Sequence, residues 1–135
     1  MKVLIGENKL QSIFKGLMSE YSDLVLKEKD YDYYDHKKNR YIDYTPINFY
    51  EDTDNDDWWE LDDWIFQYAE VPPYNEPVEG FDTPLLIYAS YRFARLTTMF
   101  GNNFNGLLKE WFESTYGYPV KQVVSDYECE KFVRI

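Results

Sequence analysis

The first strong pattern in the chain is a helical repeat of apolar residues. Hydrophobic side chains recur three and four residues apart, the spacing that lines one face of an α-helix. The residues concerned are Leu10, Ile13, Phe14, Leu17, Met18, Tyr21 and either Leu24 or Val25. Asn8 and Gln11 resemble a capping box, so we expect this helix to begin near Asn8. The preceding run MKVLI predicts a short strand or an extended arm.

Two further helices are predicted towards the end of the chain. Their apolar stripes contain Phe93, Leu96 and Phe100 in the first helix and Phe104, Leu107, Leu108 and Trp111 in the second. Gly101 and Gly117 follow these stripes and are suited to end each helix, because glycine readily takes the left-handed conformation of a C-terminal cap. The helical spacing places the aromatic residues Phe14, Phe93, Phe100, Phe104 and Trp111 in the core.

The remaining chain contains strand patterns. Two tyrosine-rich runs flank the polar HKKN, which predicts a hairpin with Tyr31 and Tyr33 on one face and Tyr41 and Asp43 on another. Pro46 should end the second strand or place it at a sheet edge. The run LLIYASY after Pro84 predicts a buried strand, and PVKQVV and KFVRI predict closing strands.

Two segments lie between the hairpin and the buried strand. The run LDDWIFQYAE, residues 61–70, predicts a short helix capped by the preceding acids. Residues 71–84 contain four prolines and a glycine, so we expect a structured loop.

These elements predict the fold class. Their order is (β)αββ(α)βααβ, which is typical of an α+β domain with an antiparallel or mixed sheet and three to four helices. No internal repeat or linker divides the chain, so residues 1–135 are predicted to form a single domain. It contains the acidic aromatic segment 51–66 and the Pro-rich loop 71–84.

Composition predicts a globular chain, and the single cysteine and the N-terminal sequence predict that it folds in a cytoplasm. Hydrophobic residues make up 44% and aromatic residues 20%, the opposite of a disordered composition. Cys129 is the only cysteine, so no intramolecular disulfide forms, which fits a reducing compartment or an assembled particle. The short apolar run at the N-terminus predicts neither a signal peptide nor a membrane span.

The net charge of −11 is concentrated in the centre of the sequence. Between Tyr41 and Tyr91 there are 13 Asp or Glu and no Lys or Arg, whereas the other 84 residues carry 12 acids and 14 bases. A field of this kind repels phosphates and attracts basic partners. We therefore expect a basic protein partner, with no direct nucleic-acid binding and no membrane binding.

The run EDTDNDDWWELDDW, residues 51–64, partly matches a calcium-binding loop. The EF-hand pattern requires oxygen ligands at loop positions 1, 3, 5 and 12, which correspond here to Asp52, Asp54, Asp56 and Asp63. Position 6 is Asp57, where the sharp turn requires glycine. The residues are therefore a weak calcium candidate, and a solvated acidic loop is the preferred interpretation.

No other group of residues predicts catalysis or a cofactor. His36 stands in a polar turn, and Cys129 lies between Glu128 and Glu130, whose charges disfavour a thiolate. The acids mostly lie adjacent in one run, whereas a glycosidase needs two carboxyl groups across a cleft. The six glycines are scattered and form no phosphate loop. We expect a protein that is not an enzyme.

The aromatic residues among charges predict a binding face. Tyrosine and tryptophan bury a large area in protein interfaces at low entropic cost. The predicted partner-binding residues are Asp54, Asp56, Asp57, Trp58, Trp59, Asp62, Asp63, Trp64, Tyr31, Tyr33 and Tyr34. A place in a satellite core stays an open alternative for the aromatic residues that lie among charges, which are Trp58, Trp59, Tyr31, Tyr33, Tyr34 and Tyr50.

Two stretches resemble a known group of proteins. The opening MKVLIGENKLQSIF has Met-Lys, an apolar triplet and Glu-Asn-x-Leu leading into a helix, and LLKEWFESTYGYPVKQVV has a helix of the Leu-x-x-Trp-x-Glu type followed by a Val-rich strand. Both resemble the ends of small uncharacterised proteins encoded by tailed bacteriophages. The resemblance implies a phage setting and brings no catalytic residues.

Three functions are compatible with these features. The preferred one is a virion structural or assembly component, present in the virion or in the cytoplasm of the infected bacterium, which contacts a basic partner and can form a homo-oligomer or a larger assembly. The second is an acidic inhibitor that imitates DNA and acts on a host nucleic-acid-binding or defence protein. The third is a carbohydrate-binding module that uses the exposed aromatic faces.

Overall fold

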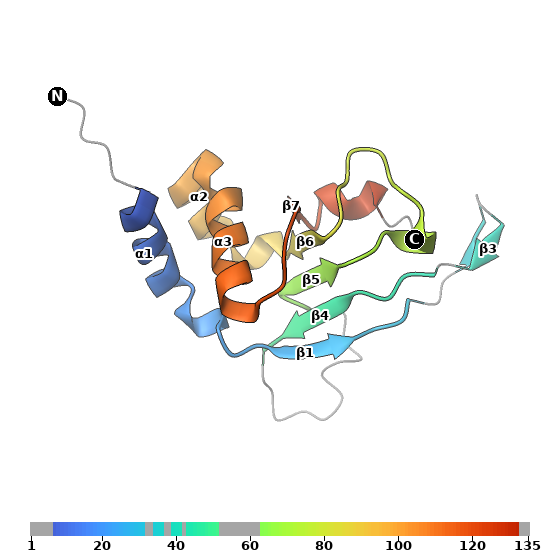
Figure 1. Ribbon diagram of the computed structural model, residues 1–135, viewed down its shortest axis with the longest axis horizontal. Helices are drawn as coiled ribbons and strands as arrows, with labels where there is room; N and C mark the ends of the chain where they lie inside the picture. Colours follow the sequence, from blue (N-terminus) through green and yellow to red (C-terminus); the bar gives the residue numbers. More distant parts are fainter. Residues whose placement is uncertain (1–6, 32–33, 37–38, 42, 52–62, 133–135) are drawn as a thin grey trace.

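The fold is α+β with a mixed sheet, as the sequence predicts (Figure 1). The computed structural model describes residues 7–31, 34–36, 39–41, 43–51 and 63–132. Its helices and strands are α1 (Glu7–Leu17), β1 (Val25–Glu28), β2 (Tyr34–Asp35), β3 (Arg40–Tyr41), β4 (Ile47–Tyr50), β5 (Phe66–Ala69), β6 (Leu85–Tyr88), α2 (Ala94–Phe100), α3 (Phe104–Tyr116) and β7 (Gln122–Ser125).

The main sheet has five strands in the order β1-β4-β5-β6-β7. Neighbouring strands are antiparallel from β1 to β6, whereas β6 and β7 are parallel. A parallel pair needs a long crossover connection, and α2 and α3 together provide it. The strands β2 and β3 form a separate hairpin with Tyr34 opposite Tyr41, which confirms the hairpin predicted from the tyrosine-rich runs.

One face of the sheet packs against the helices through aromatic rings. Side chains alternate along each strand, so Phe66 and Tyr68 of β5 face the helices. Phe66 stacks on Phe93 with ring centroids 5.3 Å apart, and Tyr68 stacks on Phe112 at 5.9 Å. The predicted core residues Phe14, Phe93, Phe100, Phe104 and Trp111 are all buried, which confirms their assignment.

The other face of the sheet is covered by loops. Leu85, Ile87 and Val124 lie in a second buried cluster. Tyr74, Val78 and Phe81 from the Pro-rich loop 71–84 and Phe132 near the C-terminus pack in the same cluster. Figure 1 shows that loop leaving and rejoining the sheet between β5 and β6. The loop therefore completes the core, since it buries the face that the helices leave open.

Both predicted glycines stand at the ends of their helices, but only Gly117 takes the predicted left-handed conformation, because the ψ of Gly101 is −127°. α2 is followed by Gly101 with a φ of 53°, and α3 is followed by Gly117 with a φ of 78°. Backbone conformations of this sign are costly for residues with a Cβ atom. The first helix begins at Glu7, one residue before the predicted start.

Two predicted elements are wrong. Residues 66–69 form β5 instead of a short helix. All four are buried, because helices cover one face of the sheet and loops cover the other. The predicted closing strand at 131–135 is replaced over its first residue by the 3-10 turn η6 (Glu128–Lys131). The predicted strand at MKVLI and residues 133–135 lie outside the described residues.

Candidate functional site at the acidic edge of the sheet

The topology brings several charged and aromatic residues to one edge of the sheet. β4, β6 and β7 all end at this edge and β5 begins there, because β4 and β6 are antiparallel to β5 and β7 is parallel to β6. Charged and tyrosine residues within four positions of these strand ends form the acidic edge, which we define as Glu51, Asp63, Tyr91, Arg92, Asp126 and Tyr127.

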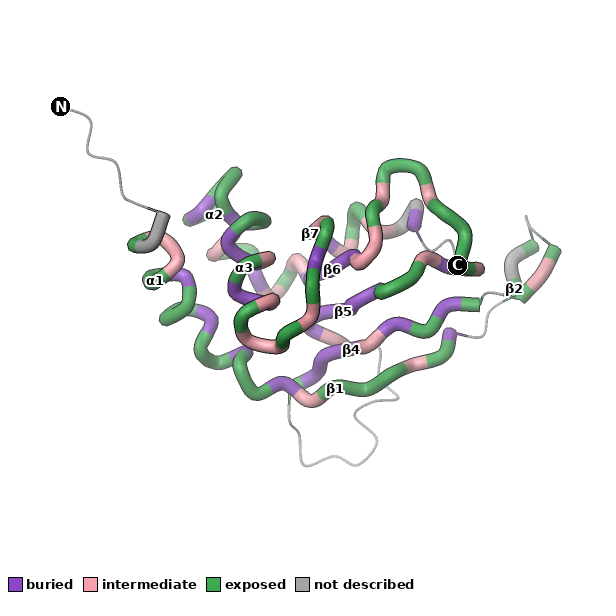
Figure 2. The backbone as a smooth tube through the Cα atoms, viewed as in Figure 1, coloured by how far each residue is buried: buried purple, intermediate pink, exposed green. Residues whose placement is uncertain are grey.

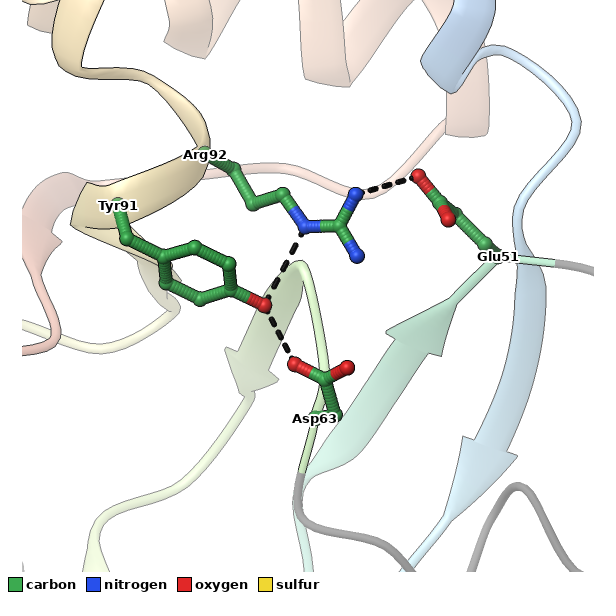
Figure 3. Close-up of polar contacts among 4 residues, drawn as sticks. All are labelled: Glu51, Asp63, Tyr91 and Arg92. Carbon is green, nitrogen blue, oxygen red and sulfur yellow. Dashed lines mark hydrogen bonds and ion pairs between the residues drawn. The ribbon is translucent and has the colours of Figure 1, made fainter.

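A short 3-10 turn after β6, η4 (Ser90–Arg92), connects both ends of the acidic aromatic segment. Arg92 Nη1 donates to Glu51 Oε1 at 2.7 Å, and Arg92 Nε donates to the Tyr91 hydroxyl at 3.2 Å. The Tyr91 hydroxyl in turn donates to Asp63 Oδ1 (Figure 3). Glu51 and Asp63 flank residues 52–62 in the sequence, so η4 contacts the chain on both sides of that segment.

These contacts shift the ionisation of two groups at the edge. The pKa of the Tyr91 phenol is raised, chiefly by desolvation of its hydroxyl and then by its hydrogen bond to the Asp63 carboxylate. The pKa of Arg92 is raised, chiefly by its hydrogen bond to Tyr91, with the Glu51 carboxylate adding to the effect. At neutral pH the edge therefore presents a neutral phenol and a guanidinium that already has a carboxylate partner.

The end of β7 adds an anchored carboxylate and an exposed ring. Asp126 Oδ1 accepts from the backbone N–H groups of Ser90 at 3.2 Å and of Tyr127 at 3.0 Å, which fixes the turn after β7 against η4. Tyr127 is 75% exposed and Tyr91 is 60% exposed. Large aromatic side chains that remain exposed beside anchored carboxylates are suited to contact a partner.

Most of the predicted partner-binding residues lie outside the described residues. These are Asp54, Asp56, Asp57, Trp58, Trp59, Asp62 and Tyr33. Of the predicted partner-binding residues in the acidic aromatic segment, Asp63 and Trp64 are described. Asp63 is exposed at the acidic edge, whereas Trp64 is half-buried against the loop-covered cluster. The structure therefore brings Asp63 to the candidate site and places Trp64 partly in the core.

The predicted tyrosines do not gather at this edge. Tyr34 belongs to the hairpin beyond the far end of β1 and is 40% exposed, with its ring against His36 and Tyr41. Tyr31 is only 6% exposed and Tyr50 only 3%. For these two the satellite-core alternative is correct, and the prediction that Tyr31 offers its side chain to a partner is wrong in this conformation.

Tyr31 is buried because it completes a polar cluster between β4 and β5. Its hydroxyl accepts from Gln67 Nε2 at 2.9 Å and from Asn48 Nδ2 at 3.2 Å. Gln67 also donates to Asn48 Oδ1 at 2.9 Å and accepts from the Tyr44 hydroxyl at 2.7 Å. Buried amides are costly unless they are paired, so the tyrosines here stabilise the sheet.

The described residues hold no group that fits a metal site. No cluster of three or more His, Cys, Asp or Glu side chains occurs within the described ranges, and the other calcium candidates Asp52, Asp54 and Asp56 lie outside them. The Cys129 thiol donates to the backbone oxygen of Asp126 at 3.0 Å, while His36 is exposed on the hairpin. No described helix is long and apolar enough to cross a membrane.

Five residues of the acidic edge were not predicted from the sequence: Glu51, Tyr91, Arg92, Asp126 and Tyr127. Tyr91 is the last residue of the predicted strand LLIYASY and Arg92 follows it, whereas Tyr127 comes after the predicted strand PVKQVV. Parallel strands end at the same edge of a sheet, so this grouping could have been found only if the parallel pairing of β6 and β7 were known.

No known protein family, curated protein or solved structure matches this chain.

Proposed function

We propose that this protein is a non-enzymatic protein-binding protein that contacts a basic partner through its acidic edge. The observation that carries the proposal is the exposure of Tyr91 and Tyr127, at 60% and 75%, among the carboxylates of Glu51, Asp63 and Asp126. The partner-binding residues predicted between Asp54 and Asp62 belong to the same proposal, because their segment begins and ends at this edge.

The two kinds of side chain have different roles in the proposed contact. Carboxylates attract a basic surface over about a Debye length, roughly 8 Å at physiological salt, and they raise the association rate. The tyrosine rings provide contact area, since an aromatic side chain buries much surface with few rotamers to restrict. Arg92 keeps the carboxylate of Glu51 and the phenol of Tyr91 in place.

As the biological setting we propose a tailed bacteriophage, with the protein a virion or assembly component. The support is the resemblance of the two ends of the chain to small phage proteins. The alternative is an acidic inhibitor of a host nucleic-acid-binding protein, which the net charge of −11 supports.

The first test is affinity capture from the source cells with matched variants as bait. The edge variant carries Tyr91→Ser with Tyr127→Ser, and a second variant carries Trp58→Ala with Trp59→Ala in the acidic segment. The control is Tyr41→Ser, because Tyr41 is 65% exposed but lies on the hairpin. We expect a basic protein that the wild type and the control capture and both other variants lose. An identical set of captured proteins with all four baits would contradict the proposal.

Salt and stoichiometry distinguish the two settings. A contact dominated by aromatic area should survive about 0.5 M salt, whereas a phosphate mimic should lose its target steeply over that range. The second measurement is the copy number of the protein in purified particles. A fixed copy number supports a virion component, and its absence from particles together with steep salt dependence supports the inhibitor.

A further inference from the structure

A groove lies between α1 and α3 in the helical layer of the molecule. The two helices pack side by side, with the Phe14 ring of α1 against the Phe104 ring of α3 at a centroid distance of 5.9 Å. Figure 2 shows them next to each other, with buried and exposed residues alternating along both. The groove has a volume of about 520 Å³, which is in the range of small-molecule sites in proteins.

The floor of the groove is apolar except for one hydrogen-bond donor. It is formed by Phe14, Leu107 and Trp111, which are 1%, 6% and 7% exposed. Among the described residues the Trp111 indole N–H has no acceptor, yet its nitrogen is not one of the side-chain atoms sealed from solvent. Because the ring lines the groove, this donor opens into it. Buried tryptophans usually pair their N–H group, so the floor favours a ligand that brings an acceptor oxygen.

The two walls of the groove carry opposite charges. Lys15 belongs to the α1 wall and Glu110 to the α3 wall, and both residues are exposed. Neither forms an ion pair with any residue that the structure describes. Gln11 and Ser114 add uncharged polar groups, one on each wall. A ligand between the walls therefore meets an ammonium group on one side and a carboxylate on the other.

We propose that this groove binds a free α-amino acid with an apolar side chain. The carboxylate of the ligand accepts from the Lys15 ammonium and the Trp111 indole N–H, and its ammonium group donates to the Glu110 carboxylate. Its side chain lies on the floor, against Phe14 and Leu107. This inference is independent of the acidic edge and goes beyond the proposed function.

Charge selects a zwitterion over an ion of one sign. A simple anion bound at Lys15 would also lie near the Glu110 carboxylate, and a simple cation bound at Glu110 would lie near the Lys15 ammonium, so each would meet an unfavourable like charge. A free amino acid carries both charges, whereas a residue at a peptide terminus keeps only one of them. Since the ligand is small and both charged side chains are exposed, we expect a dissociation constant of about 1 mM.

The test is an NMR titration of the ¹⁵N-labelled chain that follows the Trp111 indole N–H. The chain has four tryptophans, and the indole signal of Trp111 is the one that Trp111→Phe removes. The probes are L-leucine, N-acetyl-L-leucine, which lacks the ammonium group, and L-leucinamide, which lacks the carboxylate. We expect a saturable shift with L-leucine and binding that is about fivefold or more weaker with the other two. Those two probes imitate the last and the first residue of a peptide, so they distinguish a free amino acid from a peptide terminus.

Matched variants assign each charge of the ligand to its partner. Lys15→Gln should weaken the binding of L-leucine about fivefold and leave the weak binding of L-leucinamide unchanged, because that probe has no carboxylate. Glu110→Gln should weaken L-leucine and leave N-acetyl-L-leucine unchanged, because that probe has no ammonium group. The control is Lys9→Gln, at an exposed position of α1 that does not line the groove, and it should bind L-leucine as the wild type does.

Three results would overturn the proposal. The first is the absence of a saturable shift of the Trp111 signal with up to about 20 mM L-leucine. The second is equal affinity for the three probes, and the third is a loss of affinity in Lys9→Gln as large as that in Lys15→Gln. The backbone amide spectrum of each variant shows whether it is folded, so a loss of binding can be separated from a loss of structure.

Discussion

The Arg92 guanidinium lies 2.7 Å from the Glu51 carboxylate and joins the turn after β6 to the end of β4. Its neighbour Tyr91 binds Asp63 on the other side of the acidic aromatic segment. The two contacts come from consecutive residues of η4, so the positions at which segment 52–62 leaves and rejoins the described fold are fixed by one short turn. This relationship holds Glu51 and Asp63, which flank that segment, at the same edge of the sheet.

The first prediction concerns the strength of this ion pair. The Arg92 and Glu51 side chains are 28% and 45% exposed, so we expect a coupling free energy of about 0.5 kcal/mol, as for other partly exposed pairs. It can be measured by urea unfolding of Arg92→Gln, Glu51→Gln and the double variant. Arg95→Gln, on the exposed face of α2, is the matched control. Additive effects of the two changes would show that the pair contributes nothing measurable.

The second prediction concerns the buried polar cluster between β4 and β5. Gln67 is 5% exposed and bonds to Tyr31, Tyr44 and Asn48. Gln67→Ala leaves those buried groups short of a partner, so we expect the free energy of unfolding to fall by about 3 kcal/mol. Urea unfolding measures the loss, with Glu110→Ala at an exposed position of α3 as a control expected to change stability by less than about 0.5 kcal/mol. A loss of less than about 1 kcal/mol would mean that the cluster does not stabilise the fold.

Burial on both faces explains why the run that forms β5 is predicted from the sequence as a helix. Phe66 and Tyr68 face the helices while Gln67 and Ala69 face the loops, and all four are buried. A short strand buried on both faces shows no clear polar alternation, so its pattern resembles that of a buried helix segment. The acids before Trp64 also resembled a helix cap. The strand is distinguished from a helix by its contacts with distant residues. Gln67 pairs with Asn48 of β4 and accepts a hydrogen bond from the Tyr44 hydroxyl, and periodicity reveals neither contact.

The long amphipathic helices and their caps could be predicted because the information is local. Apolar spacing over three turns and a glycine at the end are sufficient to place α3. The acidic edge could not be predicted, since it is built from residues far apart in the sequence. Glu51 and Arg92 are 41 positions apart, and their contact depends on the strand order, which periodicity does not determine.

The third prediction concerns stability at alkaline pH. Burial raises the pKa of Tyr44 well above its ordinary value of 10.0. Above about pH 10 the unfolded chain releases this phenol proton while the folded chain keeps it, so the unfolded state binds fewer protons and stability falls as pH rises. The limiting slope is about 1.4 kcal/mol per pH unit for one such tyrosine. Below that range this tyrosine contributes no pH dependence.

Urea unfolding between about pH 8 and pH 11 measures this effect. The pKa values of several other phenols are raised as well, chiefly by burial, so the total loss should exceed that of one tyrosine. These phenols belong to Tyr21, Tyr68, Tyr88, Tyr91 and Tyr116. Tyr44→Phe should make the alkaline slope shallower, because the variant has one proton fewer to retain. An unchanged slope in this variant would contradict the role of Tyr44.

The fourth prediction concerns calcium. Asp63 is the calcium candidate in the described part of the chain, and its Oδ1 accepts the Tyr91 hydroxyl. The Tyr91 hydroxyl takes up one acceptor site of this carboxylate, and the segment lacks the glycine that the calcium loop requires. We therefore expect about 1 mM Ca²⁺ to raise the melting temperature by less than about 1 °C. A saturable rise that Mg²⁺ does not reproduce and that Asp52→Ala abolishes would instead establish a calcium site, and Asp63→Asn would then show whether Asp63 is one of its ligands.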